Sequence, residues 1–353
     1  MQTERRERHP YHMYDAILAQ PEAFARAVGG NEEAMDEFAS EVAGCRRLYL
    51  IGLGTSHHAA QVGEHLMLAY GGGLDARALD SFDFALYGPR LSSEDCVVAA
   101  SHRGSKRYTA RALERAREAG CRTALITGEG GSGSADVIFE TVAQEESSAH
   151  TVSYTSALAV LALLAGGIGR HRTGAETLPV GLLREEIPAA LRASLGLEER
   201  TEALAHEHVR RRRIWLLGGG PGAVTAREVA LKIKETSYLQ AEGVPTETML
   251  HGPFQCVEAE DLFVLVAPSG AARARTLEVA ELAEEVGASY VIVGDDPGAE
   301  LAVPGVPEPL SALSCLVPLQ LFAYHLALER GTNPDSFRAE DPRFARADVS
   351  RRL

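Results

Sequence analysis

Short apolar runs alternate with longer amphipathic stretches along most of the chain. In the first half these runs are Arg47–Ile51, Cys96–Ala100 and Thr123–Thr127, and glycine or serine follows each of them closely. Each run has the length of a buried strand, and the stretches between them have the length and periodicity of helices. This alternation predicts an α/β fold with parallel sheets covered by helices on both faces.

The second half of the chain repeats this order. Gly54 and Gly220, which follow the first strand of each half, are 166 positions apart, and Ser101 and Ser269 are 168 apart. Landmarks at a nearly constant offset indicate an internal duplication. The expected strands of the second half are Arg213–Leu217, Leu262–Ala267 and Tyr290–Val293.

We therefore expect two tandem domains, each a parallel sheet flanked by helices in a Rossmann-like three-layer sandwich. Residues 1–30 form an N-terminal helical segment, in which Met13–Val28 is an amphipathic helix packing on the first domain. The first domain spans 31–179 and the second spans 180–332. The tail, 333–353, shows no clear secondary structure in its sequence.

Composition narrows the class of protein. The apolar fraction of 45% and the charged fraction of 24% are typical of a soluble globular chain. No apolar run approaches the ~20 residues that cross a bilayer, and the N-terminus lacks the apolar stretch of a secretory signal. Five widely spaced cysteines without a CxxC pair favour reduced thiols over disulfides or zinc. We expect a cytoplasmic protein with no metal and no organic cofactor.

The net charge of −14 argues against nucleic acid and membrane partners, because both are anionic. A phosphate can still bind where local groups are arranged for it. Of the 35 basic residues, only Lys106, Lys232 and Lys234 are lysines. Lysine therefore occurs at these three positions against a general preference of the chain for arginine.

Two loops that follow predicted strands could bind an anion. One is Gly52–His57, and the other is Ser101–Lys106, where hydroxyls, an arginine and a lysine gather at a helix start. Glycine and serine after strands can also be plain turn and cap residues. A nicotinamide site is a further alternative, but Gly-Leu-Gly-Thr-Ser lacks the third glycine of that motif.

Glu228, Lys232 and Glu235 have the i, i+4, i+7 spacing that places side chains on one face of a helix. A carboxylate, an ammonium and a carboxylate in one stripe suit aldose–ketose chemistry, in which a proton moves between C1 and C2. The alternative is a solvated salt-bridge ladder, with Glu228 completing a capping box from Thr225. Lysine at position 232 favours catalysis, because its pKa can shift where that of arginine cannot.

His251 precedes Gly252 and Pro253 in a predicted loop. With an unperturbed pKa near ~6.5, a histidine can accept and return a proton at neutral pH. A lone histidine is more often structural than catalytic.

These motifs together resemble the sugar-isomerase (SIS) domain family. From about 14 to 332 the chain resembles the isomerase half of glucosamine-6-phosphate synthase and stand-alone phosphosugar isomerases, deaminases and Amadori-product deglycases. The most specific matches are Gly54-Thr55-Ser56, Glu228…Lys232…Glu235-Thr236-Ser237-Tyr238, His251-Gly252-Pro253 and Pro318-Leu319-Gln320-Leu321.

The resemblance implies roles for individual residues. Glu235 would be the enolising base, Lys232 and Glu228 its charge partners, and His251 the acid/base that opens the sugar ring. In relatives this histidine comes from the neighbouring subunit, which implies a homodimer with shared active sites. The implied substrate and phosphate contacts are Thr55, Ser56, Ser101, His102, Arg103, Gly104, Ser105, Lys106, Ser148, His150 and Thr151.

The chain also departs from the family pattern. Arg103 and Lys106 stand where hydroxyls are usual, and His150 replaces a small residue. We expect no glutaminase domain, and no lysine follows Lys234, so imine formation by a C-terminal lysine is unsupported.

The expected function is a phosphosugar isomerase or deaminase that acts on an amino sugar phosphate or a fructosamine-type phosphate through C1/C2 enolisation. A non-catalytic phosphosugar sensor and an ammonia-dependent, aminotransferase-like isomerase are the alternatives.

Overall fold

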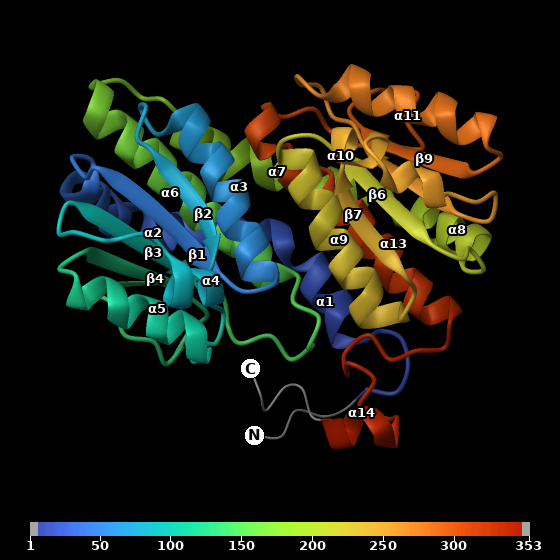
Figure 1. The fold of residues 1–353 in the computed structure, drawn as a ribbon, viewed down its shortest axis with the longest axis horizontal. Helices are drawn as coiled ribbons and strands as arrows, with labels where there is room; N and C mark the ends of the chain where they lie inside the picture. The colour runs from blue at the N-terminus through green and yellow to red at the C-terminus, as the bar shows by residue number, and fades with distance from the viewer. Residues whose placement is uncertain (1–5, 348–353) are drawn as a thin grey trace. The chain divides into compact units, whose positions relative to one another are not determined.

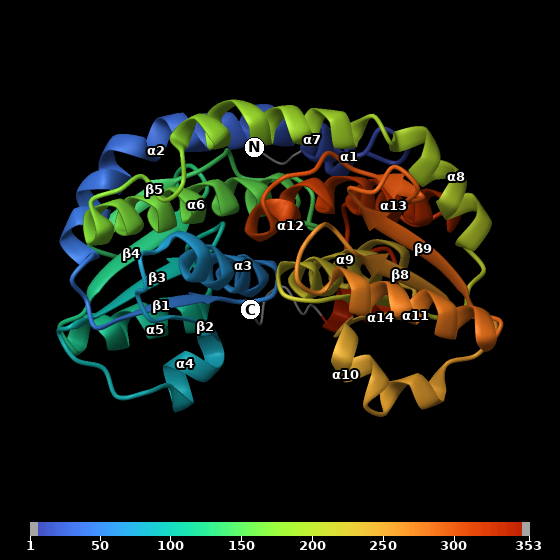
Figure 2. The ribbon, with the colours of Figure 1, turned by 90° about the horizontal axis from the view of Figure 1, so that it is seen from above.

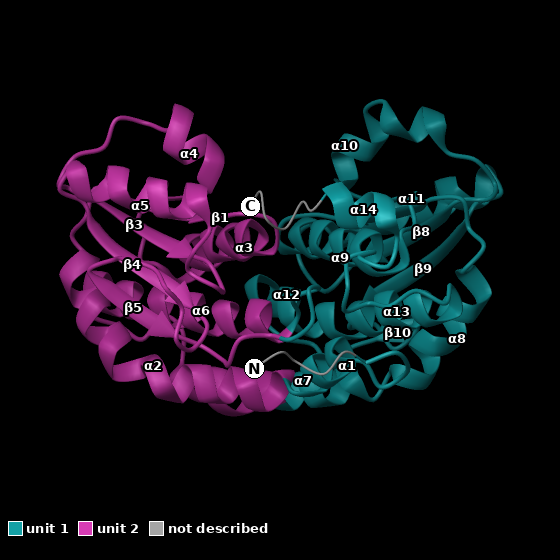
Figure 3. Cartoon of the chain, turned by 90° about the horizontal axis from the view of Figure 1, so that it is seen from below, with its two compact units in different colours: residues 1–19, 146–151, 189–352 teal, residues 20–145, 152–188, 353 magenta. Residues whose placement is uncertain are grey.

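The structure, a computed structural model, describes residues 6–347. These residues fall into two compact units (Figure 3). Unit 1 contains 6–19, 146–151 and 189–347, and unit 2 contains 20–145 and 152–188. The first five residues of the predicted N-terminal segment and the last six of the predicted tail lie outside the described residues.

Unit 2 is built on a five-stranded parallel sheet in the order β2-β1-β3-β4-β5 (Figure 1). Helices α3 and α6 pack together on one face, with α2 outside α6, and α4 and α5 cover the other face (Figure 2). The strands are β1 (Arg47–Gly52), β2 (Ala76–Asp80), β3 (Asp95–Ala100), β4 (Arg122–Thr127) and β5 (Val137–Glu140). The helices are α2 (Gln20–Val42), α3 (Thr55–Tyr70), α4 (Ser81–Tyr87), α5 (Arg107–Glu118), α6 (Val152–Thr173) and the π-helix η1 (Leu182–Glu186). Helix α7 (Ile187–Leu195) follows η1 and runs across the boundary between the units.

Unit 1 repeats this topology in a second parallel sheet, ordered β10-β9-β8-β6-β7. Its strands are β6 (Ile214–Gly218), β7 (Ala241–Pro245), β8 (Leu262–Val266), β9 (Ser289–Gly294) and β10 (Leu301–Ala302). Its helices are α1 (His12–Leu18), α8 (Glu198–His208), α9 (Pro221–Ser237), α10 (Thr246–Leu250), η2 (Pro253–Cys256), α11 (Arg273–Glu285), η3 (Glu308–Leu310), α12 (Ser311–Ser314), α13 (Leu316–Glu329) and α14 (Pro342–Ala347). Two parallel sheets of the same strand order confirm the predicted α/β fold and duplication.

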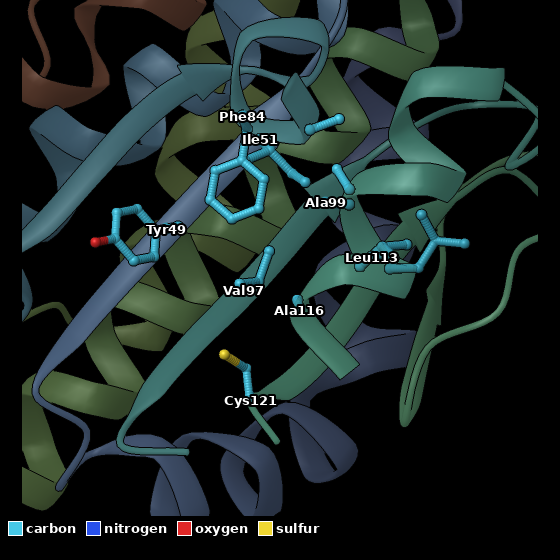
Figure 4. Packing of buried hydrophobic residues seen from close by; sticks show 11 residues of the cluster. Tyr49, Ile51, Phe84, Val97, Ala99, Leu113, Ala116 and Cys121 are labelled. Atoms are coloured by element: carbon cyan, nitrogen blue, oxygen red, sulfur yellow. The ribbon is translucent and has the colours of Figure 1, made fainter. Parts of the chain in front are cut away.

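The core of unit 2 follows from the alternation of side chains along its strands. Tyr49 and Ile51 of β1 and Val97 of β3 point to one face of the sheet, where they meet Phe84 of α4 and Leu113 of α5 (Figure 4). All five side chains are at most 2% exposed. Packing on both faces of β1 and β3 holds the carboxyl ends of these strands in fixed positions.

Two helices are long and apolar enough, by length and composition, to cross a membrane: Val152–Thr173 and the segment Glu308–Glu329. The sequence expectation that no apolar segment reaches this length is therefore wrong for these two. In the structure, 89% and 100% of their apolar windows are buried inside the protein. Such burial is typical of central core helices, which are apolar all round.

The N-terminal region differs from the predicted single helix packing on the first domain. Helix α1 ends at Leu18, and its Met13 and Ile17 pack with Leu321 and Tyr324 of α13, inside unit 1. A second helix, α2, begins at Gln20 and packs on α6 of unit 2. Pro21 explains the break, because proline is tolerated in the first turn of a helix but not in its interior.

Candidate functional site

The loop after β1 lies where β1 and β3 are neighbours in the sheet of unit 2. Strand order reverses at this point, and ligands of open parallel sheets bind in such crevices. A Cβ on Gly52 would lie 2.3 Å from the backbone of Ser56, and Gly54 has a φ of +55°. Glycine at these positions permits the sharp turn that presents the partly exposed Thr55 and Ser56 at the start of α3.

The loop after β3 leads into α5 beside the same crevice. Ser101 is buried, Arg103 and Ser105 are exposed, and Lys106 is partly buried just before the helix. Gly104 has a φ of +71°, and its N–H donates to the Ser101 carbonyl over 2.9 Å. Burial, and then the charge of Arg103, lower the pKa of the Lys106 ammonium. The two positive charges of Arg103 and Lys106 repel each other, and an anion bound between them would offset this repulsion.

His102 is only 9% exposed, and its hydrogen bonds fix the loop to neighbouring segments of unit 2. Its Nε2 accepts the N–H of Glu145 over 2.9 Å, and its carbonyl accepts the N–H of Gly128 over 2.8 Å. Burial, followed by the charge of Arg103, lowers the pKa of the imidazole to about 4. His102 is therefore neutral at pH 7, and the positive charge of the loop comes from Arg103 and Lys106.

The corresponding crevice of unit 1, between β6 and β8, is filled by the chain itself. The carboxylate of Glu308 accepts the N–H of Ala271 over 3.0 Å and lies against Gly270. Ala272 packs on Gly219, and a space of only about 10 Å³ remains. The Glu308 carboxylate thus takes the position that an anion could occupy, so the loops of unit 2 are the better phosphate candidates.

The third predicted contact segment, 148–151, belongs to unit 1, whereas the two loops belong to unit 2. The Ser148 N–H donates to the Asp335 carbonyl of the tail over 3.1 Å. Thr151 is buried, and Ser148 and His150 are partly buried. The structure therefore groups Ser148, His150 and Thr151 with the C-terminal tail.

The predicted stripe on α9 forms one connected ionic group. The Lys232 Nζ lies 2.6 Å from Glu235 Oε2 and 3.5 Å from Glu228 Oε1. The side chains of Glu228 and Lys232 are 0% and 1% exposed, while that of Glu235 is 20% exposed. The alternative of a solvated ladder is therefore wrong. The capping box is also wrong, because α9 begins at Pro221 and Thr225 lies inside it.

This arrangement can keep a carboxylate ionised and oriented at the edge of a buried site. The Lys232 ammonium lies between two carboxylates and is closed off from water, so its attraction for them is only weakly screened. Of the three groups, only Glu235 is partly open to a ligand. A positioned carboxylate of this kind can act as a general base.

His251 lies in an exposed loop between α10 and η2, and its side chain is 70% exposed. Its Nδ1 is 2.7 Å from the carbonyl oxygen of Glu247. Because a carbonyl can only accept, the Nδ1–H donates, and the neutral ring then presents Nε2 as a proton acceptor. Within residues 6–347, the polar side-chain contacts of His251 are with Glu247, on its own helix α10, and not with the α9 stripe.

Residues that the sequence reasoning missed line a cavity of about 390 Å³ beside Glu235. Tyr238 comes from the end of α9, and Phe337, Arg338 and Phe344 come from the C-terminal tail. The tail carries no periodic pattern and follows α9 by about a hundred residues. Only the long-range fold brings the two together.

Clusters suited to a metal ion are absent from residues 6–347, where no group of three or more His, Cys, Asp or Glu residues is arranged to hold one.

Residues 41–166 and 209–330 match the SIS domain family. The chain is 30% identical over 338 residues to a glutamine–fructose-6-phosphate aminotransferase (isomerizing) of Pyrococcus horikoshii. That match covers 93% of this chain but 56% of the relative, so the chain spans little more than half the length of such proteins.

Solved structures share the fold. The C-terminal domain of glucosamine–fructose-6-phosphate aminotransferase from Francisella tularensis superposes with a TM-score of 0.84 at 21% identity, covering 94% of this chain and 99% of that one. A glucosamine-6-phosphate deaminase from Thermotoga maritima gives a TM-score of 0.77 at 20% identity, with 92% and 97% covered.

Proposed function

Since the chain belongs to the SIS domain family, we propose that it is a phosphosugar isomerase or deaminase acting on an amino sugar phosphate or a fructosamine-type phosphate. The observation that carries this proposal is the buried Glu228–Lys232–Glu235 group, in which only Glu235 is open to a ligand. A protein that only binds sugars has no need for such a group. The names of the relatives, which include an aminotransferase and a deaminase, are consistent with this chemistry.

The proposed reaction begins with proton abstraction by Glu235. In a fructosamine-type phosphate, the carboxylate removes a proton from C1, and the electron pair forms the C1–C2 enol. Reprotonation at C2 moves the double bond to C1–N, and water adds to this imine. The C1–N bond then breaks, which releases an aldose phosphate and a free amine. In a 2-amino aldose phosphate the same steps begin at C2 and yield a ketose phosphate and ammonia.

The other residues support that step. Lys232 would stabilise the ionised base and the developing enolate charge. The loops carrying Ser56, Ser101, Arg103 and Lys106 would bind the phosphate. His251 would open the sugar ring through Nε2, and its 70% exposure suits donation to a second copy of the chain. On this basis we propose a homodimer with shared active sites. From the composition and the cysteine usage of the chain we also propose a cytoplasmic location.

The experiment is a substrate panel of hexosamine phosphates, fructosamine-type phosphates and their unphosphorylated parents. Release of ammonia or amine from one phosphorylated class, together with a matched keto or aldo product, would establish deamination. Interconversion of aldose and ketose without amine release would establish isomerisation instead. Tight binding without turnover of any compound would contradict the enzyme assignment and favour a sensor. Added ammonia tests the remaining alternative, an ammonia-dependent isomerase.

A further inference from the structure

A further cavity, of about 420 Å³, lies within unit 2. Its walls are α2, the C-terminal half of α6, the loop that follows α6, and the π-helix η1. Helix α2 packs along α6 (Figure 2) and also contacts η1. The volume falls in the range of small-molecule sites. None of the lining residues belongs to the loops after β1 and β3 or to the α9 stripe, so the proposed function gives this cavity no role.

The floor of the cavity is apolar. Met35 of α2, Leu163 of α6, Leu178 of the following loop and Leu183 of η1 line it, and all four residues are at most 6% exposed. Covering apolar surface of this kind contributes about 25 cal/mol for each Å² removed from water. The floor therefore suits the apolar part of a ligand.

Gly29 keeps the α2 wall of the cavity free of a side chain. It lies in the interior of a helix of 23 residues, where glycine costs about 1 kcal/mol relative to alanine. A Cβ at this position would meet no atom within 4 Å, so packing inside the chain does not require glycine here. Gly166 on α6 differs, because its Cβ would lie 3.2 Å from the Cβ of Leu178.

The η1 wall is an uncommon backbone element. Leu182–Glu186 form a π-helix, and π-helical turns are rare and frequent at functional sites. Two consecutive residues of this turn, Leu183 and Arg184, both line the cavity. The turn thus supplies one apolar and one charged side chain to the same space.

The rim of the cavity carries two arginines, and both are already neutralised. Arg170 at the end of α6 is paired with Asp36 of α2. Arg184 of η1 is paired with Glu32 of α2. An anionic ligand would have to displace one of these carboxylates to reach a guanidinium.

Two further carboxylates on the rim remain available. Glu33 of α2 and Glu176 of the loop after α6 line the cavity and are exposed. Neither has an ion-pair partner among residues 6–347. With both arginines paired, the rim therefore has two carboxylates in excess, and it attracts a positive charge.

We propose that this cavity binds an amphipathic cation, a molecule with an apolar body and one ammonium group. The body lies on the apolar floor, and the ammonium pairs with Glu33 or Glu176. An anion would meet the excess of carboxylates, and a wholly polar cation would leave the floor uncovered. The proposal does not depend on the proposed function, because it uses no residue of the phosphate loops or of α9.

The first test uses three probes with the same apolar chain: hexylamine, hexanol and hexanoate. Saturation-transfer NMR titrations measure their affinities for the full chain at pH 7, where the amine is protonated. Hexylamine should bind about 5- to 10-fold more tightly than hexanol, and hexanoate more weakly than both. Replacing Glu33 and Glu176 together by Gln should remove the preference for the amine and leave the affinity for hexanol unchanged. The same change at Glu37 and Glu199, two exposed carboxylates outside the cavity, should retain the preference.

The second test fills the cavity. Gly29→Leu adds a side chain at its wall and should abolish binding of both hexylamine and hexanol. Gly30→Leu is the matched control and should leave both affinities unchanged, because Gly30 is equally exposed and open but does not line the cavity.

Equal affinity for the three probes, or binding that survives Gly29→Leu, would overturn the inference. Absence of binding of any probe to the wild type would do so as well. If, in that case, Gly29→Leu also disrupted a dimer that Gly30→Leu preserved in size-exclusion chromatography, a second copy of the chain would be the occupant.

Discussion

Lys232 combines full burial with an ionic role. Its side chain is 1% exposed, and its ammonium lies between the carboxylates of Glu228 and Glu235. Removing one partner of a buried ionic group leaves the others uncompensated, which typically costs about 3–5 kcal/mol. Lys232→Met should therefore lower the free energy of unfolding by about that amount in chemical denaturation.

Lys234 supplies a matched control, because it is exposed and only two positions further along α9. Lys234→Met should change stability by no more than about 0.5 kcal/mol. Equal stability of the two variants would show that the buried group is not held together by the ammonium.

His102 should make stability depend on pH. Its pKa is lowered from 6.5 to about 4 in the folded chain, so between these values the unfolded state binds more protons than the folded state. The contribution of the neutral His102 to the free energy of unfolding is fully present above pH 6.5 and is lost as the pH falls toward 4. The loss should be roughly 3 kcal/mol.

Denaturation of the wild type and of His102→Gln at several pH values between 4 and 7 would measure this contribution. The variant keeps a hydrogen-bond acceptor for the Glu145 N–H but does not titrate. Its stability should fall less steeply than that of the wild type over the same interval. Parallel curves would mean that His102 does not contribute to the pH dependence.

The loop between β3 and α5 is the proposed binding site for the phosphate of the substrate. Phosphorylated sugars should raise the midpoint temperature of thermal unfolding, whereas their unphosphorylated parents should not. Replacing Arg103 and Lys106 together by Gln should remove most of that shift. Arg111→Gln, an exposed arginine one turn into α5, should preserve it. Equal shifts with both classes of sugar would exclude phosphate recognition by this loop.

The sequence located the central strands but not the edges of the sheets. The central strands are visible in the sequence as short apolar runs between helical stretches, because they are buried between helices. These strands are β1, β3, β4, β6, β8 and β9. By contrast, β2 reads Ala-Arg-Ala-Leu-Asp and β7 reads Ala-Glu-Gly-Val-Pro, and both lie mostly part-exposed. Their strand conformation comes from pairing with a neighbour, which no local pattern records.

The same distinction applies to the site. The stripe of Glu228, Lys232 and Glu235 could be predicted because helical spacing places these side chains on one face. The loops after β1 and β3 could be predicted because they follow apolar strands. The cavity beside Glu235 could not, since Tyr238 and Arg338 are a hundred residues apart and meet through the anchored tail. The position of 148–151 beside the tail could not be predicted either, because Ser148 hydrogen-bonds to Asp335, which lies far along the chain.

Complementation between two inactive variants can test the proposed homodimer. Glu235→Gln and His251→Ala chains should each be inactive alone. If His251 completes the site of a partner, mixed dimers contain one site with both native residues and should recover up to about a quarter to a half of the wild-type activity. Mixing Glu235→Gln with the double variant provides the control. Failure to recover activity in verified mixed dimers would place the whole site within one chain.

Solvent deuterium exchange measures directly whether Glu235 moves a proton between C1 and C2 of the substrate. With the phosphorylated compound that the panel identifies, wild-type enzyme should incorporate deuterium at C1 or C2. Glu235→Gln keeps the shape of the side chain but cannot take the proton, so exchange should slow by about 10²- to 10⁴-fold while calorimetry still detects binding. Exchange at the wild-type rate in that variant would contradict the assignment and reduce the α9 stripe to a structural ionic group.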